Sequence, residues 1–359
     1  MRTILLTGYP GFLGSALLPR LLRRAPDTRV ACLVQERFRA VAEARLAADV
    51  PEALDRVRVV TGDIGVDGLG LGRGAVDRRE VEEVFHLAAV YDLGVEDAVA
   101  ERVNVEGTRR VLEWTADCPA LARFHYVSTC YVSGRHPGRF LETQLEHGNL
   151  FNNAYERTKY LAEVLVWRRL TAGLPGTIYR PSIVVGDSRT GATQKFDGPY
   201  HAIQWVLRQP RVAVMPVVGD PGATYLNVVP RDFVVDAIEA LSRDPDAVSR
   251  TYQLADPDPL TVAGMLEVLA HVLDKRIIRV PLARELARWA LGRVPGVQAL
   301  LRIPPPVVDY FTHPTLYDVR VARDALDHHG IAVPRFAEYA PRLVDFMRRN
   351  AQVGSVGMA

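Results

Sequence analysis

Short apolar runs alternate with segments of helical periodicity along the first half of the chain. The first run, residues 3–7, is followed at once by glycines and then by residues 13–24, whose leucines recur at helical spacing. Strands that alternate with helices at such intervals are typical of an α/β fold with a parallel, doubly wound sheet. Further runs of strand length are residues 29–34, 57–60, 84–89, 124–128 and 176–185, and helix-like segments are residues 95–114 and 154–170.

The regular alternation weakens after about residue 186, where Gly and Pro become frequent. Helical patterns still recur at residues 230–242, 260–273 and 336–349. We therefore expect residues 1–186 to form the domain with the parallel sheet. Residues 187–359 should form mainly a smaller C-terminal lobe, with some segments returning to the first domain.

Composition argues against several classes of protein. Hydrophobic residues make up 48% and charged residues 24% of the chain, and a formal net charge of +2 provides no basic field for nucleic acid. Three widely spaced cysteines without a Cys-x-x-Cys pair argue against a disulfide framework and a metal site, so we expect a reducing cytoplasm. We see no transmembrane segment, because no window reaches the roughly 18 to 20 continuous apolar residues that one needs. The apolar N-terminal run is too short for a signal peptide.

Three glycines, Gly8, Gly11 and Gly14, follow the first predicted strand and open the first predicted helix. Glycine at this spacing allows a tight turn, a close approach of the backbone to a pyrophosphate and close packing of the helix on the strand. The N–H groups at the start of the helix then face the phosphates. In this context the motif predicts a Rossmann-type domain that binds a dinucleotide.

The end of the second predicted strand bears on which nicotinamide cofactor binds. NAD sites usually place an acidic residue there for the ribose hydroxyls, whereas NADP sites have an arginine nearby. Gln35 occupies this position, Arg37 and Arg39 lie just beyond, and Glu36 lies between them. The pattern favours NADP over NAD, although Glu36 leaves NAD open and arginine is common throughout this chain.

Tyr155 and Lys159 form the most specific chemical pattern. Positions four residues apart share one face of a helix, so the Lys159 ammonium can lie beside the Tyr155 phenol, lower its pKa and hold a cofactor ribose. A tyrosine with its ordinary pKa near 10 is otherwise a poor acid or base at neutral pH. Lysine occurs only at positions 159, 195 and 275, so the spacing rarely arises by chance. It predicts proton transfer at this helix.

Ser128 and Thr129 stand at the end of the fifth predicted strand. Ligands gather at the carboxyl ends of parallel strands, so a hydroxyl here could hydrogen-bond a substrate carbonyl oxygen. Serine and threonine also commonly satisfy backbone groups where strands end, and this alternative stays open.

Taken together, the ordered motifs resemble the extended short-chain dehydrogenases/reductases. The resemblance extends over about residues 3–240, and Pro10 departs from the small residue that is commoner in the glycine turn. It rests on TGYPGFLG (7–14), GDI (62–64), HLAA (86–89), NVEGT (104–108), the Ser-Thr pair, YxxxK (155–159) and YRPSIVVG (179–186).

This resemblance implies roles for individual residues. Tyr155 would be the general acid/base, Lys159 the ribose anchor and electrostatic partner, and Thr129 the hydroxyl of a catalytic triad. Alignment favours Thr129 over Ser128, and Asp63 would reach the adenine. The residues implied in cofactor binding are Gly8, Tyr9, Gly11, Phe12, Leu13, Gly14, Gln35, Arg37, Arg39, Asp63, Ile64, Leu87, Ala88, Ala89, Asn104, Ser128, Tyr155, Lys159, Arg180, Pro181 and Ile183.

Within that family the chain is similar to the acyl-thioester (fatty acyl-CoA or carrier-protein) reductases of the male-sterility-like group. The similarity lies in GDIGVDGLGLG (62–72), FHLAAVYDL (85–93), YVSTCYVSG (126–134) and RPSIVVGDSRTG (180–191). It implies a cytoplasmic NAD(P)-dependent oxidoreductase, with NADPH favoured, that reduces a small-molecule carbonyl or an acyl thioester on CoA or a carrier protein. Residues 1–186 would bind the cofactor and residues 187–359 mainly the substrate, in a monomer or homodimer.

Other functions stay open at this point. The same fold could serve an NAD-dependent nucleotide-sugar epimerase or dehydratase, or a hydroxysteroid or polyketide ketoreductase. A non-catalytic NADP sensor would need the glycines but no acid/base pair, so the intact Tyr155 and Lys159 argue against it.

The C-terminal lobe carries weaker signals. Residues 284–302 combine arginines with apolar side chains and could form a lid or a membrane-surface helix, but Pro295 and Gly296 favour a packed helix–turn–helix. Several other side chains are expected near the cleft, although packing within the lobe explains each equally well. They are Lys195, Phe196, Tyr200, Trp205 and Tyr225.

Overall fold

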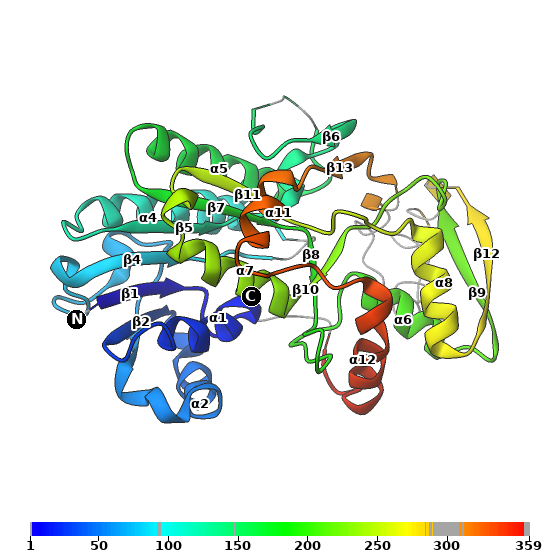
Figure 1. The fold of residues 1–359 in the computed structure, drawn as a ribbon, viewed down its shortest axis with the longest axis horizontal. Coiled ribbons are helices and arrows are strands. Elements are labelled where there is room, and N and C mark those ends of the chain that lie inside the picture. The colour runs from blue at the N-terminus through cyan, green and yellow to red at the C-terminus, as the bar shows by residue number, and fades with distance from the viewer. Residues whose placement is uncertain are drawn as a thin grey trace.

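The structure, a computed structural model, describes residues 2–91, 95–146, 148, 150–283, 285, 286, 289, 309, 310 and 312–354. Its centre is a seven-stranded sheet in which all neighbouring strands are parallel, in the order β11-β7-β5-β4-β1-β2-β3 (Figure 1). The strands are β1 (Arg2–Thr7), β2 (Thr28–Val34), β3 (Val57–Thr61), β4 (Val81–His86), β5 (Arg123–Val127), β7 (Gly176–Pro181) and β11 (Arg250–Leu254).

Helices cover both faces of this sheet. On one face lie α1 (Phe12–Leu22), α2 (Arg39–Asp49) and α7 (Arg231–Arg243), and on the other lie α4 (Gly107–Ala116) and α5 (Ala154–Thr171) (Figure 1). The predicted α/β fold with a doubly wound parallel sheet is therefore confirmed.

The alternation of side chains along β1 shows why both faces are covered. Ile4 and Leu6 pack in one core cluster with α1 and α7, whereas Leu5 packs in a second cluster with α4 and α5. Strands buried on both faces have continuous apolar sequences, which is why β1 could be predicted from its sequence.

The C-terminal lobe has a core of its own. Helices α6 (Pro199–Leu207), α8 (Val262–Leu273) and α12 (Phe336–Arg349) pack with a two-stranded parallel sheet of β9 (Val212–Val218) and β12 (Arg276–Leu282). In Figure 1 this lobe lies to the right of the main sheet. Two later segments return to the main sheet, because α7 packs against α1 and β11 forms an edge strand.

Residues 176–185 differ from the single strand that was expected. The main sheet keeps β7 only as far as Pro181, and β8 (Ile183–Val185) pairs instead with β10 (Val228–Pro230). Pro181 has no backbone N–H with which to extend the ladder. This stretch therefore connects the main sheet to the lobe.

The helix expected over residues 95–114 is divided into α3 (Asp97–Ala100), a π-helical turn (Glu101–Glu106) and α4. A small parallel sheet pairs β6 (Gly138–Phe140) with β13 (Thr315–Tyr317), and α11 (Arg320–Asp327) follows it. Among the described residues, short 3-10 turns include Glu36–Phe38, Pro51–Arg56, Asp67–Gly70, Arg78–Glu80, Cys130–Ser133 and Pro245–Ala247.

Within the part of the chain that the structure describes, no helix is long and apolar enough to cross a membrane. The same residues contain no group of three or more His, Cys, Asp or Glu side chains that could hold a metal ion. The expected lid or surface helix at residues 284–302 falls almost entirely outside the described residues. Leu286 and Trp289, which are described, are about half exposed.

Candidate active site

Four neighbouring strands of the main sheet end side by side, because β7, β5, β4 and β1 are adjacent and parallel. Gly8 directly follows β1, Leu87 follows β4 and Ser128 follows β5. Ligands of doubly wound sheets bind outside these carboxyl ends. The structure therefore brings the glycine turn, the HLAA segment and the Ser-Thr pair to one edge of the sheet.

The glycine turn is closely packed. Gly8 has a φ of +89°, and a Cβ there would lie 2.8 Å from the backbone nitrogen of Ala88. A Cβ on Gly14 would lie 2.5 Å from the carbonyl oxygen of Gly8. Helix α1 begins at Phe12 with no side-chain cap from a described residue and no acidic residue in its first turn. Its first N–H groups can therefore receive an anion, which fits the pyrophosphate of a dinucleotide.

A cavity of about 390 Å³ lies at the end of β2. Its walls include Gln35, Arg37 and Asp63, three of the residues implied in cofactor binding. The Gln35 amide donates to Asp63 Oδ2 (2.9 Å), and Arg37 Nε donates to Gln35 Oε1 (2.9 Å). Arg39 does not line the cavity and instead pairs with Glu43 at 2.9 Å. Of the two arginines predicted to favour NADP, Arg37 is the one that lines the cavity.

The segment after β4 is fixed against the glycine turn. Thr7 Oγ1 accepts hydrogen bonds from the backbone nitrogens of Leu87 (3.2 Å) and Ala88 (3.1 Å). Asn104, which is buried, donates to Thr158 of α5 at 3.0 Å and also bonds the backbone that follows HLAA. Asn104 thus ties the end of β4 to the helix that carries the predicted acid/base pair.

Other implied cofactor residues lie along the same edge. Phe12 and Leu13 form the first turn of α1, where the Phe12 ring lies 5.0 Å from the guanidinium carbon of Arg231 and Leu13 packs against the core. Ala89 continues the segment after β4, and Ile183 packs against the core of the lobe.

Three side chains implied in cofactor binding are instead engaged within the protein. Arg180 is fully buried, pairs with Glu163 at 2.6 Å and donates to the carbonyl oxygen of Gln144 at 2.8 Å. Tyr9 and Ile64 are buried in the two core clusters. Any contact of these residues with a cofactor would have to come from their backbone, because the side chains already have partners or are packed.

Helix α5 presents the predicted acid/base pair on one face. It begins at Ala154 and is capped by Asn153, whose side-chain oxygen accepts from the backbone nitrogen of Glu156 (3.0 Å). Tyr155 lies in the first turn and Lys159 one turn later. Both side chains are buried, at 9% and 4% exposure.

The two hydroxyls after β5 have different partners. Ser128 Oγ donates to the Glu163 carboxylate, whereas the Thr129 hydroxyl lies near enough to the Tyr155 phenol to lower its pKa. Thr129 Oγ1 also lies 3.4 Å from the carbonyl oxygen of Pro181. Of these two hydroxyls, that of Thr129 influences the Tyr155 phenol, while that of Ser128 is bonded to Glu163.

Lys159 is held by the strand beneath it. Its Nζ donates to the Tyr126 hydroxyl (2.9 Å) and to the carbonyl oxygen of Val127 (2.8 Å). Burial lowers the pKa of Lys159 to about 7, while the Glu163 carboxylate opposes this shift. Tyr126 was missed in the sequence. Tyr126 lies in β5 two residues before Ser128, so both side chains point to the same face of the sheet. This spacing could have identified Tyr126 from the sequence.

The pKa of Tyr155 differs from the expectation. Burial raises it above the ordinary value, and the hydrogen bond from Thr129 lowers it only in part. The sequence pattern predicted that Lys159 would lower this pKa, but the ammonium is directed at Tyr126 and Val127 instead. Tyr155 therefore keeps its proton at neutral pH, which suits a proton donor.

Tyr91 lies between Tyr155 and Lys195, a residue of the lobe, and contacts both. Tyr91 packs edge-on against Tyr155 with ring centroids 4.9 Å apart, and the ammonium of Lys195 lies 4.0 Å from the centre of the Tyr91 ring. Lys195 also pairs with Asp197 at 2.6 Å. Tyr91 was not singled out in the sequence, although its place shortly after β4 put it at the ligand edge.

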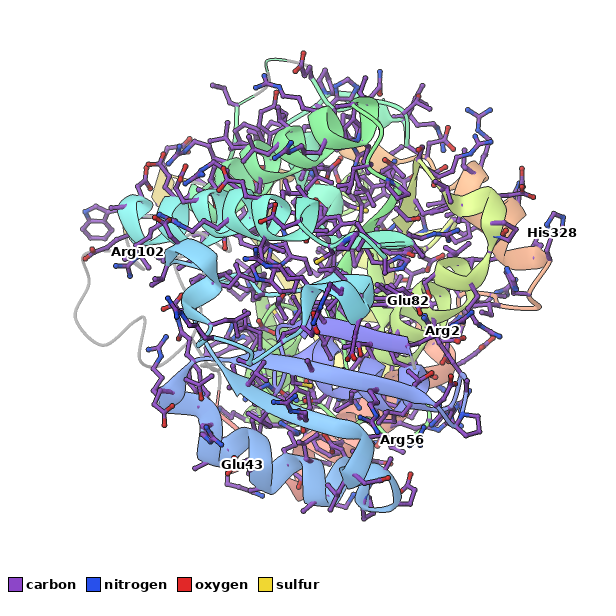
Figure 2. All side chains as sticks on the ribbon, turned by 90° about the vertical axis from the view of Figure 1, so that its left-hand side faces the viewer. Arg2, Glu43, Arg56, Glu82, Arg102 and His328 are labelled. Atoms are coloured by element: carbon purple, nitrogen blue, oxygen red, sulfur yellow. The ribbon has the colours of Figure 1, made fainter. Side chains whose placement is uncertain are left out.

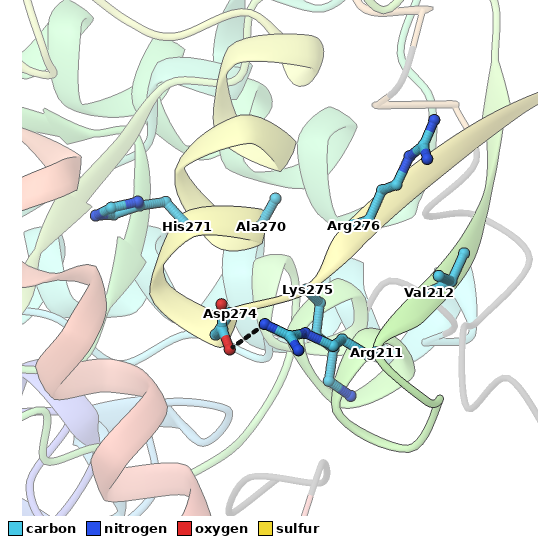
Figure 3. Close-up of a pocket in the computed structure, with 7 residues that line it drawn as sticks. All are labelled: Arg211, Val212, Ala270, His271, Asp274, Lys275 and Arg276. Atoms are coloured by element: carbon cyan, nitrogen blue, oxygen red, sulfur yellow. Dashed lines mark hydrogen bonds and ion pairs between the residues drawn. The ribbon is translucent and has the colours of Figure 1, made fainter.

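The aromatic residues expected near the cleft have other surroundings. Phe196 and Tyr200 are buried in the core of the lobe, the Trp205 indole donates to the carbonyl oxygen of Val214, and Tyr225 is exposed. A second cavity, of about 370 Å³, lies between the end of α8 and the start of β9 and β12 (Figure 3). It contains none of the predicted site residues, so we do not assign it to this site.

Comparisons of sequence relate the chain to known proteins. A family model described as male sterility protein matches residues 6–238. One subunit of the linear gramicidin synthase of Brevibacillus parabrevis is 29% identical over 268 residues, which are 71% of this chain and 5% of that protein. Fatty acyl-CoA reductase 1 of Arabidopsis thaliana is 30% identical over 181 residues, 43% of this chain and 36% of that protein. The chain thus spans only a small part of the length of these relatives.

Solved structures share the fold over almost the whole chain. The terminal R domain from the myxalamid PKS-NRPS biosynthetic pathway has a TM-score of 0.83 and 26% identity, covering 98% of this chain and 92% of that one. UDP-glucuronic acid 4-epimerase from Bacillus cereus, in complex with NAD, has a TM-score of 0.69 and 17% identity, covering 98% of each chain. At that identity, the second likeness concerns the fold alone.

Proposed function

The chain belongs to the male sterility protein family of extended short-chain, NAD(P)-dependent reductases, and from this membership we propose that it reduces an acyl thioester or carbonyl with hydride from NADPH. In this proposal Tyr155 donates the proton. The related fatty acyl-CoA reductase and the terminal R domain support an acyl thioester on CoA or a carrier protein as substrate.

The observation that carries the proposal is that Thr129, at the end of β5, and Tyr155, in the first turn of α5, come together at the carboxyl edge of the sheet, where the Thr129 hydroxyl lowers the pKa of the phenol. A carbonyl oxygen placed against both hydroxyls would accept two hydrogen bonds, which polarise the carbonyl for attack. Bound NADPH would supply the hydride to the carbonyl carbon. Tyr155, whose pKa burial holds above its ordinary value, carries the proton that the oxygen needs.

Lys159 supplies a cation one helical turn after Tyr155. Its ammonium is already bonded to Tyr126 and Val127, so its position is fixed before any ligand enters. A fixed cation near the developing alkoxide, or near a cofactor ribose, costs little reorganisation during the reaction. We propose that Lys159 fills the ribose-anchoring role that its spacing from Tyr155 predicts.

The choice of NADP rests on the end of β2. Gln35 supplies an amide where an NAD site usually has a carboxylate, and Arg37 lies beside it on the wall of the cavity. A carboxylate would repel a 2′-phosphate, whereas a guanidinium binds it. These residues support a preference for NADPH.

The experiment that tests this function is an NADPH-consumption assay with acyl-CoAs, carrier-bound acyl groups, aldehydes, ketones and sugar nucleotides. The Tyr155→Phe variant should bind cofactor almost unchanged yet lose at least about a hundredfold in turnover, the scale of lost acid/base catalysis. Tyr160→Phe, on the same helix, serves as the matched control. Retained turnover in Tyr155→Phe would refute the role of this phenol. Conversion of a sugar nucleotide without net NADPH consumption, detected by analysis of the products, would favour an epimerase or dehydratase.

A further inference from the structure

We propose that Arg102 is a second cation for the 2′-phosphate of NADP(H), acting with Arg37 at the mouth of one cavity. This inference rests on the proposed cofactor. Arg37 follows β2 and Arg102 follows β4, and these two strands flank β1, whose glycine turn would bind the pyrophosphate. The cavity of about 390 Å³ is lined by both arginines.

The remaining walls of this cavity suit a flat base. Five valines branch at Cβ and have few rotamers, so they form a stiff apolar surface. Asp63, the one carboxylate among the described lining residues, accepts hydrogen bonds from the backbone nitrogen of Gly65 (2.7 Å) and from Gln35 (2.9 Å). The valines are Val66, Val90, Val95, Val99 and Val103.

Among the described residues that line this cavity, the two arginines outnumber the single carboxylate. Arg37 donates to the neutral amide of Gln35 and stacks on Phe38, with its guanidinium carbon 4.6 Å from the ring centre. Neither Arg37 nor Arg102 forms an ion pair with a carboxylate of the described residues. A phosphomonoester carries a charge of about −1.5 to −2 at neutral pH and accepts bidentate hydrogen bonds from arginine.

The acidic neighbours of Arg102 in the chain have other partners. Glu101 pairs with Arg157 at 2.7 Å, and Glu106 pairs with Arg109 at 2.8 Å. These pairs leave the charge of Arg102 without a local counterion among the described residues. A bound phosphate would supply one.

The backbone around Arg102 has an unusual conformation. Arg102 lies in the π-helical turn between α3 and α4, and such turns are rare and occur frequently at functional sites. Two residues later, buried Asn104 fixes the turn by its hydrogen bond to Thr158. Arg102 itself is exposed at the surface (Figure 2). Its backbone is anchored while its side chain is accessible to a ligand.

The same placement would also let a guanidinium stack on adenine, and the two roles predict different binding data. We would measure the affinities of Arg102→Ala, Arg37→Ala and the double variant for NADPH and NADH by fluorescence titration. Competition with 2′,5′-ADP and 5′-AMP would isolate the adenosine half. Arg29→Ala, which removes an exposed arginine at the other end of β2, is the matched control for lost charge.

If Arg102 binds the 2′-phosphate, Arg102→Ala should weaken binding of NADPH and 2′,5′-ADP at least about tenfold, with less than a twofold effect on NADH and 5′-AMP. Arg29→Ala should change none of these affinities. Equal losses for phosphorylated and unphosphorylated ligands would show stacking on adenine and overturn the proposal, as would unchanged NADPH affinity. Failure of the wild-type protein to bind either dinucleotide would instead refute the proposed function.

Discussion

The ligand edge of the main sheet and the lobe around β9 and β12 use their side chains in different ways. At the sheet edge, buried polar groups bond to one another, as Ser128 and Arg180 do through Glu163. The lobe instead has an apolar core, and its small sheet exposes further apolar side chains such as Val214 and Ile278. Buried polar networks fix geometry, because each lost partner leaves an unsatisfied group. We infer that the sheet edge is preorganised for chemistry, while the lobe offers mainly apolar contact.

The three lysines of the chain make this difference concrete. Lys159 is buried at the sheet edge against Tyr126, and Lys275 in the lobe donates to the carbonyl oxygens that end α6. Lys195 belongs to the lobe but contacts Tyr91 next to the sheet edge. Methionine keeps an unbranched side chain and removes the charge. Replacing each lysine by methionine therefore tests the sheet edge (Lys159), the lobe (Lys275) and the contact between them (Lys195).

The largest effect is expected at the sheet edge. Lys159→Met should lower turnover at least about a hundredfold, because it removes the buried cation one turn after Tyr155, the proposed proton donor, on the same helix. Lys275→Met, the matched change in the lobe, should lower thermal stability through the lost carbonyl bonds yet leave turnover within about twofold. Steady-state kinetics and thermal unfolding of both variants check this. Comparable turnover losses in the two variants would remove the distinction between the regions.

The pH dependence of the wild-type protein should reflect the same lysine. The pKa of Lys159 is lowered to about 7 by burial, so its ammonium form predominates below pH 7 and is lost as the pH rises through that value. If the ammonium is needed, kcat/KM should fall over that range, since this parameter reports the groups of the free enzyme. The residual activity of Lys159→Met should lack this decrease.

The two regions also differ in how much of them the sequence reveals. The glycine turn was predictable, because the backbone packs so closely around Gly8 and Gly14 that no Cβ fits. These positions therefore require glycine, and the spacing of the glycines is visible in the sequence. The placement of Tyr155 and Lys159 on one face of a helix was predictable, because helical geometry fixes which spacing shares a face.

What escaped prediction depends on contacts between distant segments. The approach of Lys195 to Tyr91 arises only when the lobe folds against the sheet edge, and no periodicity encodes it. The burial that raises the pKa of Tyr155 likewise comes from tertiary packing. Edge strand β11 was missed because its residues follow α7 in a region where the regular alternation had already ended.

An intermediate effect is expected from adding one carbon atom to the glycine turn. In Gly14→Ala the new Cβ would lie 2.5 Å from the carbonyl oxygen of Gly8, so the turn must shift. Overpacking of this kind costs about 1–3 kcal/mol. We expect a lower midpoint of thermal unfolding and weaker dinucleotide binding. Gly72→Ala is the control, because a Cβ there meets no atom within 4 Å. Equal stability of the two variants would show that the turn is not constrained by packing.

The smallest effect is expected from Lys195→Met, at the contact between the lobe and the sheet edge. A cation over an aromatic ring contributes about 0.5–1 kcal/mol at exposed sites and about 2 kcal/mol when desolvated, and Lys195 is only partly buried. Its loss should let Tyr91 move relative to Tyr155 and raise KM about two- to fivefold, with a smaller change in kcat. Lys195→Arg, which keeps the charge, should retain most of the affinity. A loss of kcat as large as that of Lys159→Met would place Lys195 in the chemistry itself and would extend the preorganised edge into the lobe.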